Sequence, residues 1–169
     1  PDEGAINRNI FYSSVLGLDM GMFYKRRDYS KVVDGRNRIV AHEYMGDPVE
    51  GKDIIVADDI IASGDSMLGL LDDLKKRNAG RIFIAATFCF FTNGTQAFEE
   101  VYRSGKLAGV MGTNLTYLPD EVRKAPWFIE VDMSKYMAYI IATLNHDHSL
   151  DALLNSMGRI VNLLERYNR

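Results

Sequence analysis

The sequence predicts one α/β domain of three layers, with a mainly parallel sheet covered by helices on both faces. Short apolar segments of strand length alternate with segments whose apolar residues recur at helical spacing, a pattern typical of strand–helix–strand units. The 169 residues are 47% hydrophobic and 25% charged, which is enough apolar material for one core. No repeat, low-complexity stretch or linker divides the sequence, so residues 1–169 are expected to form a single domain.

The first half of the sequence contains one segment that fits neither periodicity. Residues 25–37 are polar, charged and irregular, and they are predicted to form a mobile loop. A fully apolar segment at 54–57 is expected to be a buried strand, because both faces of a parallel sheet are covered. The other predictions for this half are a helix over 5–16 that ends at Gly17, strands over 20–24 and 38–45, and an amphipathic helix with the apolar stripe Met67, Leu70, Leu71 and Leu74.

The second half repeats the same alternation. Residues 82–86 are predicted to form a second buried strand, and a helix is expected over 95–102. Another helix should follow Asp132, because an aspartate side chain can accept hydrogen bonds from the first N–H groups of a helix. The remaining predictions are strands near Val110 and over 127–131, a stripe formed by Met133, Met137, Ile140, Ile141 and Leu144 in the helix after Asp132, and a last helix over 157–167.

Bulk properties argue against several classes of protein. The net charge of -3, with the basic residues scattered, gives no broad cationic face for nucleic acid. No apolar stretch approaches the ~20 residues of a membrane-spanning helix, so no membrane partner is expected. A lone cysteine, Cys89, cannot form an internal disulfide, which favours a reducing, cytoplasmic location. The sequence begins without an initiator methionine, which suggests a processed chain or a fragment.

Two adjacent acids, Asp58 and Asp59, follow the apolar strand at 54–57. Ligands of open α/β sheets bind beyond the carboxyl ends of the strands, where loops and helix N-termini meet. Because neighbouring side chains of a strand point in opposite directions, at least one carboxylate is expected to face this crevice. A carboxylate there can accept hydrogen bonds from sugar hydroxyls or bind hydrated Mg²⁺.

A turn of small, polar residues follows these acids at 62–66, with the sequence Ala-Ser-Gly-Asp-Ser. Its glycine permits unusual backbone angles, and the N–H groups that begin the next helix have no acceptor within the helix. Such a turn is suited to binding phosphate. The plainer interpretation is a strand end followed by a helix cap, but the apolar strand, paired acids and hydroxyl-rich turn together favour a binding site.

A second cluster of polar residues, 145–148, contains two histidines and an aspartate. It could be interpreted as a metal site, but no distant third ligand lies in suitable register. The polarity of a helix end explains it better.

Residues 55–67 resemble the phosphoribosyl pyrophosphate (PRPP) signature of the type I phosphoribosyltransferase fold. More narrowly, the whole chain resembles the C-terminal half of ribose-phosphate pyrophosphokinase, also called PRPP synthetase. Segment 1–4 together with Arg8 resembles the stretch that opens the second half of that family. The Lys-Arg-Arg sequence at 25–27 resembles its catalytic flexible loop, and the spacing from this loop to the paired acids also fits.

The resemblance implies transfer of the pyrophosphoryl group of ATP to ribose 5-phosphate, giving PRPP and AMP, with Mg²⁺ as cofactor. It implies that Lys25 and Arg27 are catalytic and fold over the ATP phosphates, where they offset developing charge. The implied ribose 5-phosphate site consists of Asp58, Asp59, Ala62, Ser63, Gly64, Asp65 and Ser66, and the implied metal ligands are Asp2, Asp58 and Asp59.

In that family an N-terminal domain of the same fold supplies part of the ATP site, and subunits assemble into homo-oligomers. The resemblance therefore implies that ATP and ribose 5-phosphate are the small-molecule partners, that an N-terminal domain is missing from this chain, and that the chain forms a homo-oligomer. Little or no synthetase activity is expected from this chain alone.

The sequence departs from the common family pattern in the phosphate turn. Ala62 and Asp65 stand where many members have an acid and a glycine. If its carboxylate pointed inward, Asp65 would repel a phosphate at a cost of ~1 kcal/mol or more, so it is predicted to point outward. Phe88 stands where bacterial relatives often have histidine, and the tail at 153–160 does not match their regulatory segment. Their phosphate activation and ADP inhibition are therefore not implied.

Two other functions remain open at this stage. The same turn would serve a phosphoribosyltransferase that consumes PRPP. A non-catalytic subunit that senses PRPP or associates with a synthetase would also keep the fold, although Lys25 and Arg27 argue against a purely regulatory role, because a sensor does not need cations that stabilise a transition state.

Overall fold

A computed structural model describes residues 5–33 and 36–167 of the chain, with side chains described outside 24–43. Its centre is a parallel sheet of four strands, which confirms the predicted α/β class. The strands lie in sequence order, as β3 (Ile54–Ile61), β4 (Ile82–Cys89), β5 (Gly109–Thr113) and β6 (Phe128–Val131).

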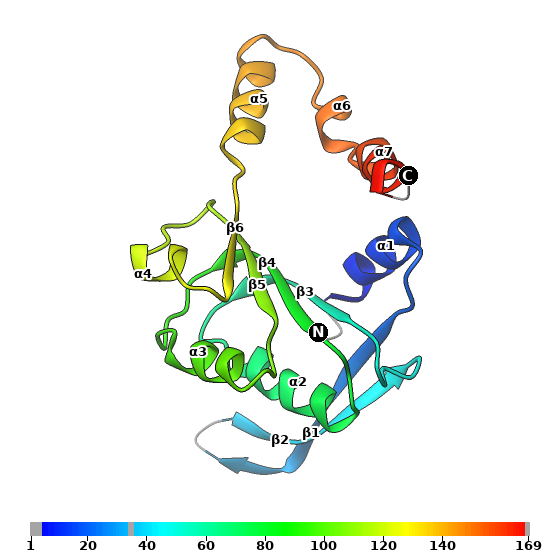
Figure 1. Ribbon diagram of the computed structural model, residues 1–169, viewed down its shortest axis with the longest axis vertical. Helices are drawn as coiled ribbons and strands as arrows, with labels where there is room; N and C mark the ends of the chain where they lie inside the picture. The colour runs from blue at the N-terminus through cyan, green and yellow to red at the C-terminus, as the bar shows by residue number, and fades with distance from the viewer. Residues whose placement is uncertain (1–4, 34–35, 168–169) are drawn as a thin grey trace.

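This strand order decides which face the connecting helices cover. Each connection leads to the next strand in the same direction, and crossovers between parallel strands are almost always right-handed. Consecutive connections therefore fall on the same face of the sheet. Figure 1 shows α2 (Asp65–Lys76) and α3 (Gln96–Arg103) side by side along that face, and the short α4 (Asp120–Arg123) follows β5.

The main core lies between this face and α2 and α3. The predicted apolar stripe of α2 is buried, which confirms the period assigned to residues 67–74. The strands contribute Val56, Ile82, Ile84 and Val110, and all four are buried. An aromatic cluster extends this core beside α3, where Phe98 stacks against Trp127 with ring centroids 5.6 Å apart.

The second face of the sheet is covered in part by α1 (Ile6–Leu16), whose residues line a cavity together with residues of β3, β4 and β5. The predicted end of α1 is confirmed, because Gly17 adopts a left-handed conformation with φ of 64°. The C-terminal helices α5 (Ser134–Asn145), α6 (Asp151–Leu154) and α7 (Met157–Tyr167) extend beyond β6 and turn back toward α1 (Figure 1). None of the three has a buried residue.

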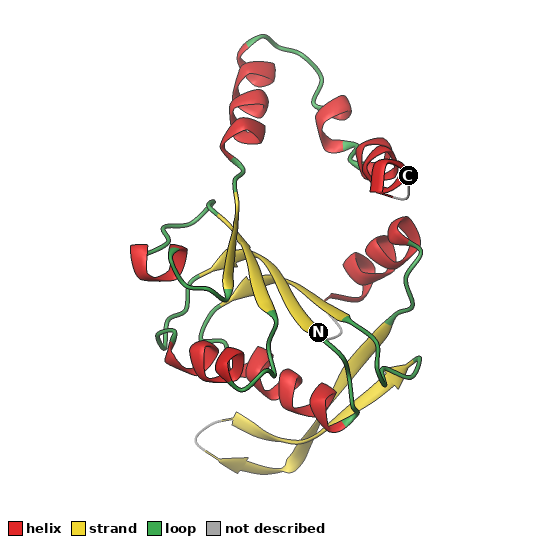
Figure 2. Ribbon diagram, viewed as in Figure 1, coloured by secondary structure: helices red, strands yellow, loops and turns green. Residues whose placement is uncertain are grey.

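The predicted loop at 25–37 is wrong for the residues that the structure describes. They belong to a long antiparallel hairpin of β1 (Gly21–Val33) and β2 (Arg36–Gly46), which Figure 2 shows as a layer separate from the central sheet. Backbone pairing holds such a hairpin together, so it does not require regular alternation of apolar side chains. Register shifts between Arg26 and Arg27 and between Arg27 and Val32 further break the period of two.

The remaining differences concern boundaries. β3 continues to Ile61, so Asp58 and Asp59 lie within the strand and not after it. The helix predicted after Asp132 begins at Ser134, whose backbone N–H donates to Asp132 Oδ1 over 2.9 Å. The short helices α4 and α6 were not predicted, since four residues are too few to show a period. Within the described residues, no helix has the length and apolarity that a membrane span requires.

Candidate functional site

The two acids of β3 occupy different environments. The side chain of Asp58 is 19% exposed and that of Asp59 is 64% exposed. The backbone N–H of Asp59 donates to Asp58 Oδ1 over 2.9 Å, which holds the Asp58 carboxylate against its own strand. Asp59 is therefore the acid that a ligand can reach more easily.

Arg8 of α1 joins this pair and was not among the predicted site residues. Its Nη2 lies 3.1 Å from Asp58 Oδ1 and 3.8 Å from Asp59 Oδ1. Fifty residues separate Arg8 from Asp58, so periodicity and local spacing carry no signal for the contact. The family resemblance of the N-terminal segment was the one feature that drew attention to this arginine.

The two acids also differ in acidity. Burial raises the pKa of Asp58, and its contact with Asp59 adds to this shift. Close contact with the Asp58 side chain lowers the pKa of Asp59, with a smaller contribution from the charge of Arg8. The pair therefore presents a well-ionised, exposed carboxylate at Asp59 beside a more sheltered one at Asp58, a combination suited to a hydroxyl or cation ligand.

The turn after β3 depends on Gly64. This residue is the N-cap of α2 and has φ of 92°, a left-handed conformation that side-chain-bearing residues rarely adopt. A Cβ at this position would also lie 2.5 Å from Phe98 Cε2. Both the backbone angle and the packing against α3 therefore require glycine here.

Backbone hydrogen bonds from the segment after β4 fix the turn in place. The N–H of Phe90 donates to the Ile61 carbonyl over 2.8 Å, and the N–H of Thr92 donates to the Ala62 carbonyl over 2.9 Å. The first helical hydrogen bond of α2 joins the N–H of Leu68 to the Gly64 carbonyl. The N–H groups of residues 65–67 therefore precede the helical ladder. That of Asp65 donates to Ser63 Oγ over 3.4 Å, and those of Ser66 and Met67 can serve an anion.

Asp65, the first residue of α2, only partly meets its prediction. It is exposed, but its Oδ2 accepts a hydrogen bond from Ser63 Oγ over 2.9 Å. The carboxylate therefore lies against the turn instead of pointing away from it. An acid in the first turn also interacts favourably with the helix dipole.

The other predicted site residues lie on the hairpin or near the N-terminus. Lys25 and Arg27 belong to β1, where their backbones pair with His42 and Ile39 of β2. Their side chains lie outside the described part of the structure. Asp2 also lies outside the described residues.

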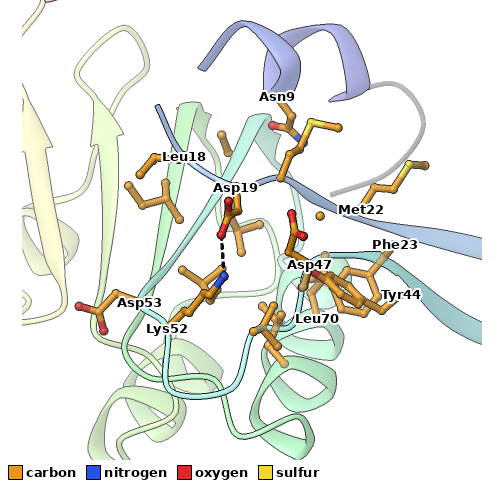
Figure 3. A pocket seen from close by; sticks show the side chains of 18 of the residues that line it. Asn9, Leu18, Asp19, Met22, Phe23, Tyr44, Asp47, Lys52, Asp53 and Leu70 are labelled. Carbon is orange, nitrogen blue, oxygen red and sulfur yellow. Dashed lines mark hydrogen bonds and ion pairs between the residues drawn. The ribbon is translucent and has the colours of Figure 1, made fainter. Parts of the chain in front are cut away.

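Two neighbouring cavities of about 440 Å³ each flank the sheet edge at β3. One lies at the base of the hairpin and is mainly apolar, with Phe23, Tyr44 and Leu70 among its walls (Figure 3). Lys52 and Asp19 form an ion pair there, with Nζ and Oδ2 2.5 Å apart. The other cavity lies between α1 and the second face of the sheet and includes Arg8 and Asp58 in its lining.

The described residues contain no group of three or more His, Cys, Asp or Glu side chains that could bind a metal ion together. This includes the 145–148 cluster, where the rings of His146 and His148 lie 6.1 Å apart. Asp58 and Asp59 offer two carboxylates. Such a pair suits Mg²⁺, which keeps several waters and commonly binds one or two carboxylates together with substrate phosphates.

Comparison with known proteins yields a family and several relatives. The family model described as "Phosphoribosyl transferase domain" matches residues 1–106. A ribose-phosphate pyrophosphokinase from Vibrio parahaemolyticus is 28% identical over 156 residues, which are 92% of this chain and 46% of that protein. One from Thermococcus kodakarensis is 36% identical over 104 residues, 62% of this chain and 34% of that protein.

A solved structure shares the fold. The crystal structure of phosphoribosylpyrophosphate synthetase from Mycobacterium smegmatis matches with a TM-score of 0.65 and 22% identity, over 87% of this chain and 44% of that one. This chain thus spans less than half the length of each of these three relatives.

Proposed function

Because this chain belongs to the phosphoribosyl transferase domain family, we propose that it supplies the ribose 5-phosphate site of a ribose-phosphate pyrophosphokinase. The observation that carries the proposal is the continuous element from Asp58 to α2, in which two acids are followed by a rigid turn and a helix N-terminus. The curated relatives bear the same activity in their names.

In this reaction the anomeric hydroxyl of ribose 5-phosphate attacks the β-phosphorus of ATP, and AMP leaves. The 5-phosphate would bind the N–H groups of residues 66 and 67 and the hydroxyls of Ser63 and Ser66. Asp59, and Asp58 through its second oxygen, would accept hydrogen bonds from the ribose hydroxyls. This arrangement orients the nucleophilic hydroxyl, and positioning accounts for much of the catalysis of phosphoryl transfer.

Mg²⁺, when bound, offsets the charge of the pyrophosphoryl group. Asp59 is the residue best placed to hold it, because its carboxylate is exposed and its pKa is lowered by its contact with Asp58. Asp58 would contribute as the second carboxylate, and Asp2 stays a proposal that rests on the family resemblance.

Lys25 and Arg27 would act from the hairpin. A long antiparallel ribbon can carry cations beyond the edge of the domain, and β1 pairs with β2 through both residues. In this proposal their charges meet the phosphates of ATP and stabilise the transition state. The remainder of the ATP site would come from a further domain or another subunit, so the chain alone is expected to turn over ATP and ribose 5-phosphate very slowly.

The proposal is tested by measuring ribose 5-phosphate binding to the chain by calorimetry in the presence of Mg²⁺. Asp59→Asn is expected to weaken binding about tenfold, the equivalent of one charge-assisted hydrogen bond. Asp120→Asn, which removes an exposed acid in α4, is the matched control and should leave binding unchanged. Equal affinities of Asp59→Asn and the unaltered chain would contradict the assignment. Release of pyrophosphate from PRPP on addition of a nucleobase would favour a phosphoribosyltransferase instead.

A further inference from the structure

Arg8 forms the only ion pairs of the described residues that involve the paired acids of β3. Its guanidinium reaches both acids, and its side chain is 29% exposed. Arg8 lies in the first turn of α1, a helix with no buried residue. The arginine is therefore a specific polar link between α1 and the proposed ribose site.

One N–H donor of Arg8 has no hydrogen-bond acceptor within the described residues. This donor, Nε, is inaccessible to solvent, whereas Nη2 donates to Asp58 Oδ1. Arg8 therefore binds the Asp58 carboxylate through one oxygen, and not through both as an arginine fork can. A buried N–H without an acceptor costs free energy, and the ion pairs of the same guanidinium with Asp58 and Asp59 offset this cost.

Asp58 Oδ1 already accepts two hydrogen bonds, from Arg8 and from the N–H of Asp59. These two donors fix the plane of the carboxylate and leave Oδ2 as the oxygen with capacity for a ligand. Arg8 and Asp58 also line the cavity between α1 and the sheet, so the ion pair borders space that a small molecule can enter.

We propose that Arg8 is a positioning residue for ribose recognition, which holds Asp58 Oδ1 so that Asp58 Oδ2 accepts a hydrogen bond from the 2-hydroxyl of ribose. This inference rests on the proposed function, since it concerns the same site. It assigns Arg8 no contact with the phosphate. Selectivity for the hydroxyl and affinity for phosphate should therefore respond differently to changes at Arg8.

A purely structural role of Arg8 makes a different prediction. If the ion pair only attached α1 to the sheet, loss of Arg8 would lower the free energy of unfolding. It would also weaken the binding of every ligand of the site by the same factor. The effect would then be the same for sugars with and without the 2-hydroxyl. A comparison of ligands thus separates the two roles.

The test measures the affinities of ribose 5-phosphate, 2-deoxyribose 5-phosphate and inorganic phosphate for the 169-residue chain by calorimetry. Arg8→Met is expected to weaken ribose 5-phosphate binding about tenfold and to reduce the preference for ribose over deoxyribose, with phosphate binding unchanged. Arg8→Lys should restore part of the preference, because it keeps the charge but not the planar fork. Arg103→Met, which breaks a surface pair with Glu99, is the control and should alter none of the affinities.

The variant Asp58→Asn tests whether Arg8 acts through Asp58. If Arg8 acts through Asp58, Arg8→Met should have no further effect on selectivity in an Asp58→Asn background. Thermal unfolding checks that each variant is folded, and Arg8→Lys and Asp58→Asn keep the test decisive if Arg8→Met does not fold.

Three results would overturn the inference. The first is an unchanged preference for ribose over deoxyribose in both Arg8→Met and Arg8→Lys. The second is an equal loss of affinity for all three ligands. The third is that Arg8→Met and Asp58→Asn reduce this preference additively. If the unaltered chain binds ribose 5-phosphate and one of these results follows, the proposed function stands and only the role of Arg8 fails. If the unaltered chain does not bind ribose 5-phosphate, both fail.

Discussion

At the scale of single residues, Asp65 is the most unusual feature of the phosphate turn. Its carboxylate accepts a hydrogen bond from the Ser63 hydroxyl, so it places negative charge beside the proposed phosphate and occupies a donor that the phosphate could use. Asp65→Asn is expected to tighten ribose 5-phosphate binding about threefold at low salt, and less at high salt because ions screen the repulsion. Calorimetry at two salt concentrations measures this. Weaker binding by Asp65→Asn would show that the carboxylate helps the site.

Gly64 offers a second test at the residue scale. Gly64→Ala is expected to lower the free energy of unfolding by about 2 kcal/mol or more, because the left-handed backbone disfavours a Cβ and Phe98 occupies its space. Gly94 has a similar φ of 80° but open space around it, so Gly94→Ala should cost only about 1 kcal/mol. Urea unfolding measures the difference. Equal losses would mean that contact with Phe98 is unimportant.

At the scale of elements, the base of the hairpin that carries Lys25 and Arg27 packs against the rest of the domain. Phe23 is buried there and packs against Tyr44, with ring centroids 5.2 Å apart. Phe23→Ala is expected to destabilise the chain by about 3 kcal/mol and to expose the hairpin to proteases. Met45→Ala is the control, since Met45 lies in the same hairpin but is 58% exposed. Equal protease resistance of the two variants would contradict this anchoring role.

At the scale of the whole molecule, apolar side chains remain exposed on α5 and on the second face of the sheet. Ile141 of α5 is 63% exposed, and Ile55 of β3 is 53% exposed. Exposed large apolar side chains are common in protein–protein contacts, and we propose that this chain forms a homo-oligomer. Sedimentation is expected to give a mass above the 19.1 kDa of one chain.

Ile141→Asp tests whether α5 takes part in this association. It should weaken self-association about tenfold and leave the single chain folded, because the residue is not packed within its own chain. Asn155→Asp adds the same charge at an exposed position between α6 and α7 and should have no effect. A single-chain mass for the unaltered protein would contradict the proposal.

Sequence alone determined the features that depend on local pattern. Apolar runs predicted β3 and β4, and the stripe from Met67 to Leu74 predicted the buried face of α2. The acids, the small residues and the glycine of the turn were readable for the same reason, since a tight turn before a helix needs these residue types at adjacent positions.

Only the tertiary structure decided the features that join distant residues. The strands predicted over 20–24 and 38–45 overlap β1 and β2, but their extension through 25–37 escaped prediction. The pairing there uses backbone groups, which every sequence supplies. The Arg8–Asp58 ion pair and the contact of Gly64 with Phe98 depend on how α1 and α3 pack around the sheet. Local spacing therefore predicted the paired acids and the turn after β3, whereas packing across 50 residues of sequence brought Arg8 to Asp58.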